Sequence, residues 1–185
     1  MTVIATLIPP DVALAPGGFR VEVEADRTRT ELLFSYCVTG PVDRLLIPPS
    51  ASPGRHDLLW HHSCFEAFLR PVGGTAYLEL NFSPSSRWAA YEFDGFRAGM
   101  RNAGGIGAPS ILTVQSPTEL RLNVTVPLLA GQMLPHDLAV DIGLSTILED
   151  KEGHLSFWAL AHPPEKPDFH HGDCFARQLA APKAP

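Results

Sequence analysis

Turn-forming residues interrupt this sequence at short intervals, and this feature most limits what the chain can fold into. The 185 residues include 18 prolines and 15 glycines. Pairs such as Gly17-Gly18, Gly73-Gly74 and Ser116-Pro117 separate the apolar runs, and such pairs are typical of turns. A helix bundle needs long stretches with a 3.6-residue apolar period, which these breaks do not allow. The spacing therefore favours short strands joined by turns.

The runs between the turns are either fully apolar or alternate between apolar and polar residues, as strands do. In segment 77–83 the even positions are apolar, while the odd positions include Glu79 and Asn81. Segment 119–126 alternates in the same way. We expect strands over residues 2–8, 19–26, 30–39, 63–71, 75–83, 87–93, 111–116, 118–126, 138–148, 154–161 and 174–179.

Many short strands without a convincing helix predict an all-β fold, a two-sheet antiparallel β-sandwich that is jelly-roll-like. No internal repeat or change of composition marks a boundary, so residues 1–185 are expected to form a single domain. The longest connections are 41–59, 94–110 and 162–173. Loops above a rigid sheet commonly carry function, so we expect a binding site there.

The charge pattern argues against a nucleic-acid partner. The chain has 14 basic and 20 acidic residues, a net charge of −6, and its arginines and lysines do not cluster. No apolar run is long enough to cross a membrane. The sequence indicates no oligomeric state.

The chain is expected to be cytoplasmic. Its first residues lack a basic segment, and Pro9 and Pro10 break the apolar run, which is not the pattern of a signal peptide. Cys37, Cys64 and Cys174 are odd in number and widely spaced. This arrangement argues against a disulfide framework and against a cysteine-rich zinc site.

Glu66 lies in an unusual setting. In segment 64–69 both alternating faces are largely apolar, so a strand here would place the Glu66 carboxylate away from bulk water. A desolvated carboxylate needs a hydrogen-bond or charge partner. Glu66 is therefore either a buried brace paired with an internal arginine or part of the lining of a ligand pocket.

Three segments carry a resemblance to a known family. They read WHHSCFEAF (60–68), YLELNFSPSSRWAAY (77–91) and SFWALAHPPEKPDFH (156–170). Together they resemble the bacterial DOMON-like proteins, which are related to family 9 carbohydrate-binding modules. The resemblance covers nearly the whole chain, and it implies a β-sandwich that binds its ligand against one sheet or at the loop end.

The resemblance also implies site residues. In the sugar-binding relatives a tryptophan precedes a strand glutamate and an arginine follows, the order of Trp60, Glu66 and Arg87. An indole stacks on the apolar face of a sugar ring, while the charged groups hydrogen-bond to hydroxyls. A second aromatic side chain from near the C-terminal end closes the site in those relatives. Here that residue would be Phe175, Trp158 or Phe169.

The expected function is non-catalytic binding of a small polar ligand, a saccharide or a sugar-containing metabolite. The predicted ligand-binding residues are Trp60, Glu66, Glu79, Asn81, Arg87, Trp88, Trp158 and His170. No catalytic residue and no metal ligand is assigned. For each of the three tryptophans, packing in the core or at its rim is the alternative.

Other functions stay open beside this one. A small hydrolytic or isomerising enzyme would use Glu66 with Glu79 or His170 as acid and base. Haem b binding, which occurs among the relatives with Met and His ligands, would draw on Met100 or Met133.

A divalent ion is the remaining cofactor considered. Asp168, His170 and Asp173 lie close together in one loop, and Glu66 or His62 could join them through space. The sequence contains no HxH or HxxxH spacing that would strengthen such a site. The expected cofactor set is therefore none, with haem b and a divalent ion as the alternatives.

Overall fold

The computed structural model describes residues 2–11, 16–164 and 166–182. One sheet contains β1 (Val3–Leu7), β2 (Arg20–Arg27), β3 (Glu31–Thr39), β9 (Ser110–Gln115) and β10 (Glu119–Pro127). The other contains β4 (Gly54–Arg55), β5 (Cys64–Pro71), β6 (Tyr77–Phe82), β7 (Arg87–Phe93), β8 (Arg101–Asn102), β11 (Val140–Glu149), β12 (Leu155–Ala159) and β13 (Arg177–Leu179). Short 3-10 turns are η2 (Pro16–Gly18), η3 (Val42–Arg44), η4 (Leu59–His61) and η5 (Gly172–Cys174).

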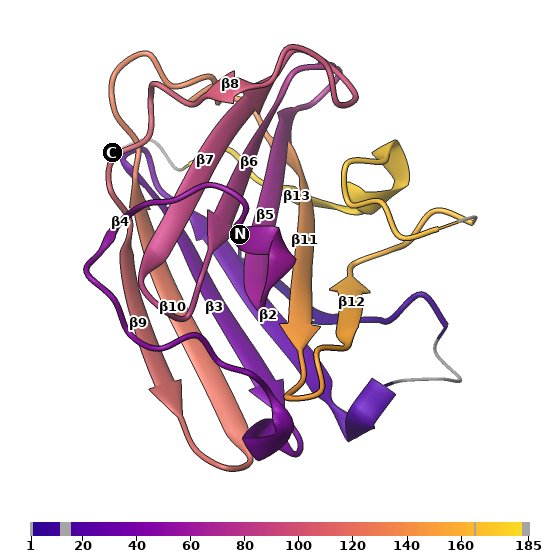
Figure 1. Cartoon of the computed structure of the whole chain (residues 1–185). Coiled ribbons are helices and arrows are strands. Elements are labelled where there is room, and N and C mark those ends of the chain that lie inside the picture. The colour runs from indigo at the N-terminus through magenta and orange to yellow at the C-terminus, as the bar shows by residue number, and fades with distance from the viewer. Residues whose placement is uncertain (1, 12–15, 165, 183–185) are drawn as a thin grey trace.

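The two sheets pack face to face as a sandwich (Figure 1). The five-stranded sheet has the order β1-β2-β3-β10-β9. The eight-stranded sheet has the order β12-β11-β5-β6-β7-β4, with β13 beside β11 and β8 beside β7. The predicted all-β, two-sheet β-sandwich is confirmed.

Each predicted strand run overlaps an observed strand whose ends lie within three residues of the predicted ones. The two-residue strands β4 and β8 were not predicted, because two residues are too few to alternate. β4 also runs parallel to β7 and is the exception to the antiparallel pairing of the described strands.

The main core lies between the sheets. Alternate residues of β10, such as Leu120 and Leu122, are fully buried there, as are Leu80 and Phe82 of β6. Tyr36 of β3 crosses this core and donates a hydrogen bond from its hydroxyl to the main-chain carbonyl of Glu66, at 2.7 Å. This bond holds the β5 backbone at Glu66, whose side chain points to the other face of the sheet, away from the core.

A second apolar cluster covers the outer face of the eight-stranded sheet. It contains Phe68, Tyr77 and Phe93 from the strands and Phe169 and Phe175 from the chain between β12 and β13. Two connections lie over it, the β7–β8 loop (residues 94–100) and the described parts of the β12–β13 loop (residues 160–164 and 166–176). A sheet face covered by loops in this way can hold a pocket.

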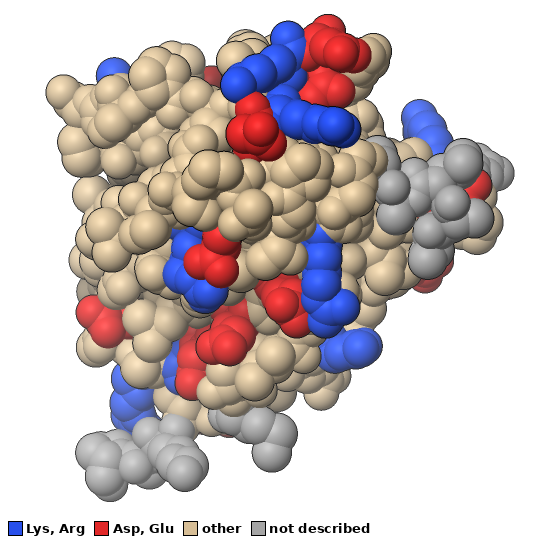
Figure 2. Space-filling model, turned by 90° about the horizontal axis from the view of Figure 1, so that it is seen from below, with Lys and Arg blue, Asp and Glu red and all other residues tan. Residues whose placement is uncertain are grey.

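Three further features are the state of the cysteines, the distribution of surface charges and the length of the helices. Cys37, Cys64 and Cys174 are free and buried, in agreement with the prediction of no disulfide framework. Figure 2 shows acidic and basic side chains mixed on the face seen from below. Among the described residues, no helix is long and apolar enough to cross a membrane.

Candidate functional site

A cavity of about 330 Å³ lies on the outer face of the eight-stranded sheet, beneath the two covering loops. Strand residues that line it are Glu66, Phe68, Glu79, Phe93, Ile147 and Phe157. Residues from η4 and the loops that line it are Trp60, Arg97, Met100, Pro167, Asp168, Phe169 and His170. Strands therefore form the floor, and the loops together with Phe93 of β7 and Phe157 of β12 form the walls.

The pairing of β5 with β6 places two carboxyl groups side by side on this floor. Glu66 is opposite Asn81, and Phe68 is opposite Glu79. All four side chains share one face, and diagonal neighbours in an antiparallel pair lie ~7–8 Å apart. The alternation seen in segment 77–83 thus gives β6 one face for the core and one for the cavity.

Glu66 is buried and lacks a cationic partner. Glu66 is only 3% exposed. The Ser145 hydroxyl donates a hydrogen bond to Glu66 Oε2 at 3.2 Å. No arginine or lysine of the described chain pairs with it. Burial, and next the charge of Glu79, raises the pKa of Glu66 to about 8, against the opposing hydrogen bonds from Ser145 and Cys64. The arginine brace is therefore not what the structure contains.

Glu79 has a similar setting. It is 5% exposed, and Asn81 donates from Nδ2 to its Oε1 at 2.7 Å. Burial raises the pKa of Glu79 to about 7, opposed by the Asn81 hydrogen bond and the Arg97 charge. Both floor carboxyls therefore change protonation near neutral pH, unlike glutamates in water.

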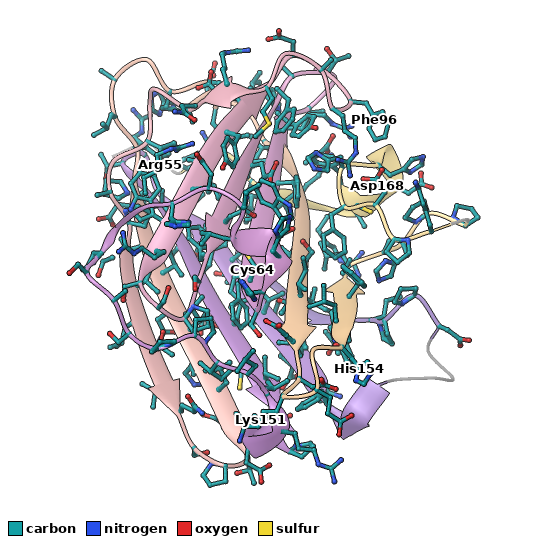
Figure 3. The ribbon with its side chains drawn as sticks, viewed as in Figure 1. Arg55, Cys64, Phe96, Lys151, His154 and Asp168 are labelled. Carbon is teal, nitrogen blue, oxygen red and sulfur yellow. The ribbon has the colours of Figure 1, made fainter. Side chains whose placement is uncertain are left out.

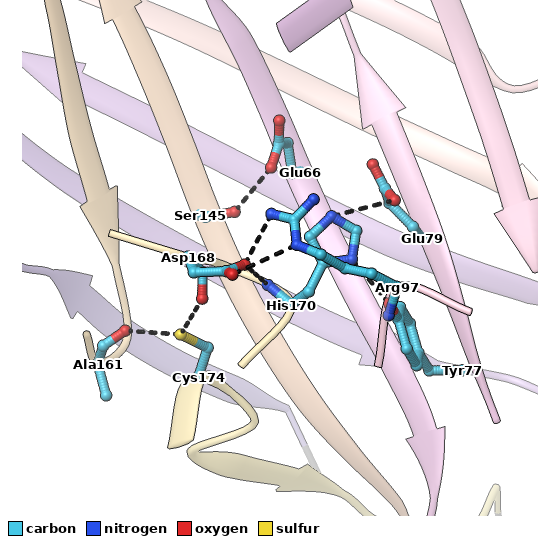
Figure 4. A network of polar contacts seen from close by, with 9 residues as sticks. All are labelled: Glu66, Tyr77, Glu79, Arg97, Ser145, Ala161, Asp168, His170 and Cys174. Atoms are coloured by element: carbon cyan, nitrogen blue, oxygen red, sulfur yellow. Dashed lines mark hydrogen bonds and ion pairs between the residues drawn. The ribbon is translucent and has the colours of Figure 1, made fainter. Parts of the chain in front are cut away.

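His170 stands between the carboxyls and Tyr77 (Figure 4). Its Nδ1 lies 2.7 Å from the Tyr77 hydroxyl, which accepts the Arg97 backbone N–H at 3.3 Å. With that hydroxyl donating to Nδ1, a neutral imidazole carries its proton on Nε2, which lies 3.8 Å from Glu79 Oε2. Burial and the Arg97 charge lower the pKa of His170 to about 4. The imidazole is thus neutral at pH 7.

A bidentate ion pair joins the two covering loops. Arg97 donates from Nη2 to Asp168 Oδ1 at 2.8 Å and from Nε to Oδ2 at 3.3 Å. Phe96 and Asp168 lie at the same edge of the molecule (Figure 3), and the Phe96 and His171 rings are 6.4 Å apart. The Arg97–Asp168 ion pair spans the rim of the cavity and uses the Nε and Nη2 donors of the Arg97 guanidinium.

Aromatic side chains form the opposing walls. Trp60 stands two residues after Leu58, whose φ of 62° turns the chain into η4. The Trp60 ring contacts Tyr91 of β7 edge-on, with the ring centroids 6.1 Å apart. Phe157 of β12 and Phe169 are 6.2 Å apart. Because β7 and β12 lie on opposite sides of β5 and β6, the floor carboxyls have an apolar wall on each side.

The structure brings four of the predicted residues to the cavity, namely Trp60, Glu66, Glu79 and His170. Asn81 lies beneath it and holds Glu79. Phe169, one of the three aromatic residues proposed to close the site, is in the wall.

Three predicted residues lie elsewhere. Trp158 fills the main core at 2% exposure and donates from Nε1 to the Ser156 hydroxyl. Trp88 packs against the same core, with the Arg55 guanidinium 5.9 Å from its ring. Arg87 begins β7 at the end beside Gly54 and does not line the cavity. The structure does not bring these three residues to the cavity with Glu66. Trp88 and Trp158 face the core because neighbouring strand residues point to opposite sides, whereas Arg87 shares the outer face with Tyr91 and Phe93 but lies at the far end of β7.

Arg97 and Phe68 were not predicted as site residues. Phe68 could have been found, since it is two residues beyond Glu66 and so shares its face. Arg97 could not, because its position depends on the path of the β7–β8 loop, where its own φ is 52°.

The residues considered as alternative metal or haem ligands lie in different parts of the structure. Asp168 is held by Arg97, and the His62 ring lies 2.7 Å from Glu149. Met100 lines the cavity with His170. Within the described ranges, the residues whose ligand atoms lie close enough to share an ion are Asp150, Glu152 and His154, at the turn between β11 and β12.

Comparison with known proteins extends this description. No protein-family model matches the chain, and no curated protein matches it in sequence. A Bacteroides uniformis protein assigned to carbohydrate binding has a similar structure, with a TM-score of 0.64, 14% identity, and 96% of this chain and 85% of that chain covered.

A family 9 carbohydrate-binding module of Caldicellulosiruptor kristjanssonii is also similar. Its complex with glucose has a TM-score of 0.54 at 10% identity, covering 94% of this chain and 82% of that one. The complex with cellotriose gives 0.52 at 10%, covering 92% and 79%. The chain has the fold of these carbohydrate-binding proteins.

We expect Asp168→Asn to loosen the rim of the cavity more than it destabilises the fold. Arg97 is 55% exposed, so losing this ion pair should cost about 1 kcal/mol or less of unfolding free energy. Amide hydrogen exchange should quicken in residues 94–100 and 166–171, with β5 and β6 unchanged. Glu22→Gln, which breaks the exposed Arg20–Glu22 pair on the other sheet, is the control. Unchanged exchange in both loops would contradict the bridging role.

Proposed function

We propose that the protein binds a small saccharide, without catalysis, in the cavity over β5 and β6. The observation that carries this proposal is the pair of buried carboxyl groups, Glu66 and Glu79, between aromatic walls that include Trp60 and Phe169. A sugar ring has apolar faces and a hydroxyl edge. Aromatic rings suit the faces, and carboxyl groups suit the hydroxyls.

The size of the cavity supports a small ligand. About 330 Å³ is at the lower end of the ~300–1,000 Å³ of ligand pockets. One sugar unit, or the end unit of a chain, fits that scale. The fold supports the same proposal, since the family 9 module similar to this chain is seen with glucose and with cellotriose.

Isothermal titration tests the proposal. Glucose, cellotriose and a panel of other monosaccharides should include at least one saccharide that binds saturably at one site per chain. Leu112→Ala, on an exposed strand of the other sheet, should bind it equally well. If no sugar binds at concentrations up to about 10 mM, every dissociation constant would correspond to a binding free energy weaker than ~3 kcal/mol. That result would contradict the proposal.

Acid–base catalysis is the second candidate, favoured by one specific observation. The pKa values of Glu66 and Glu79 are raised to about 8 and about 7, the range in which carboxyls act as general acids at neutral pH. Incubation with chromogenic nitrophenyl glycosides distinguishes the two functions. Glycoside turnover that Glu66→Gln abolishes would establish an enzyme. Binding of sugars without turnover would support non-catalytic binding and exclude hydrolysis of these glycosides.

A further inference from the structure

We infer that the cavity selects a positively charged ligand, an amino sugar or a comparable small organic ammonium ion, whose cation would lie against Glu66 and Glu79. This inference rests on the proposed function for the saccharide part. It goes beyond that function by giving the ligand a charge. The argument starts from the charges around the cavity.

The cavity has more acidic groups than cations to balance them. The acidic groups on its floor are Glu66 and Glu79. Among the described residues that line the cavity, the one cation, Arg97, forms a bidentate bond with Asp168, although its charge also lowers the pKa of Glu79. His170 is buried, bonded to Tyr77 and neutral at pH 7, because its pKa is lowered to about 4. Other titratable groups close to the two glutamates are Tyr36 on β3, Cys64 on β5, Tyr77 on β6 and Tyr91 on β7. None of these can supply a positive charge.

The donors that the protein supplies to the two carboxyl groups are neutral. Ser145 and Cys64 donate to Glu66, and Asn81 donates to Glu79. A buried carboxylate without a cation is costly. An ammonium group brings both the missing charge and three N–H donors, whereas a hydroxyl brings one neutral donor.

The aromatic side chains of the floor and walls suit a cation as well. Phe68 and Phe93 each have a ring centroid 5.2 Å from that of His170, and both line the cavity with Trp60. Aromatic faces attract ammonium ions, most strongly where water is excluded. Aromatic walls around a pair of carboxyls therefore recognise an organic cation better than a neutral sugar of the same size.

Isothermal titration at pH 7 with glucose, glucosamine, N-acetylglucosamine and tetramethylammonium tests this inference. Glucosamine should bind at least tenfold more tightly than glucose. N-acetylglucosamine, which lacks the charge, should bind no more tightly than glucose. Tetramethylammonium cannot titrate, so its affinity should rise several-fold from pH 5 to pH 8 as the two carboxyls ionise.

Variants assign the effect to the floor. Glu66→Gln with Glu79→Gln should abolish the preference for glucosamine over glucose, and Glu79→Gln alone should reduce it if the double variant does not fold. Glu24→Gln, exposed on the outer face of β2, removes the same charge and should keep the preference.

Each outcome has one meaning. Equal binding of glucose and glucosamine would overturn the inference and leave the proposed function in place. Binding of tetramethylammonium without any sugar would support the cation site and overturn saccharide binding. If no compound binds, both are overturned.

Discussion

Glu66→Gln should make the ligand-free protein more stable at pH 8, by on the order of 2 to 4 kcal/mol. The substitution keeps the shape of the side chain and removes a group whose ionisation is unfavourable in the fold. Glu66 has a pKa raised to about 8 because it is buried, and Glu79 has a pKa raised to about 7. Unfolding restores both to about 4.3. At pH values between the unfolded and the folded pKa, the folded chain therefore binds more protons than the unfolded chain.

The sign of the pH dependence follows from this difference. The stability contributed by the two carboxyls is fully present below their unfolded pKa and is lost as the pH rises through about 7 and 8. His170 acts oppositely, because its pKa is lowered to about 4, but its contribution is complete above ~6.5. From pH 6.5 to 8 the wild-type protein should lose about 2 kcal/mol.

Urea unfolding at pH 6, 7 and 8 measures this dependence. The unfolding free energy of the wild-type protein should fall as the pH rises, and that of Glu66→Gln should change less with pH. Glu24→Gln, on the exposed face of the other sheet, should follow the wild type. A Glu66→Gln protein that is less stable than wild type at pH 8 would mean that the Glu66 charge has a stabilising partner, and the charge distribution described for the cavity would be wrong.

Trp60→Ala should weaken saccharide binding by about 10- to 100-fold, because burying an aromatic side chain against a ligand contributes about 1.5–3 kcal/mol. Trp60 is half-buried at the cavity wall, so the fold should lose little stability. Titration with the tightest sugar of the panel measures the change.

Phe96→Ala is the matched control for Trp60. Phe96 is an aromatic residue of the β7–β8 loop that is 59% exposed and does not line the cavity. Its replacement should leave the affinity within about twofold. Equal losses in the two variants would indicate a general effect of the covering loops rather than stacking on Trp60.

The strands were predictable because alternation is a local property. The segment around Glu79 and Asn81 specifies one apolar and one polar face without reference to the rest of the chain. The apolar residues on both sides of Glu66 indicated its desolvation. The sandwich that these strands form, and its likeness to family 9 modules, is confirmed. The relation to DOMON-like proteins stays a prediction.

The composition of the cavity walls was less predictable, since it depends on contacts between distant segments. Arg87 matched the expected order of tryptophan, glutamate and arginine, yet the arginine in the cavity is Arg97. Its place follows from a left-handed residue in a loop and from an ion pair to Asp168. Trp88 and Trp158 point into the core because of strand register, which a tryptophan in a sequence does not reveal.

The indole N–H signals of the three tryptophans test the central claim most directly. Trp60 lines the cavity, whereas Trp88 and Trp158 pack against the main core, so two of the signals are internal controls. In a nitrogen–proton correlation spectrum, titration with glucose or glucosamine should move the Trp60 indole signal saturably and leave the other two in place. An unmoved Trp60 signal at saturating sugar, or movement confined to Trp88 or Trp158, would contradict a saccharide site in this cavity.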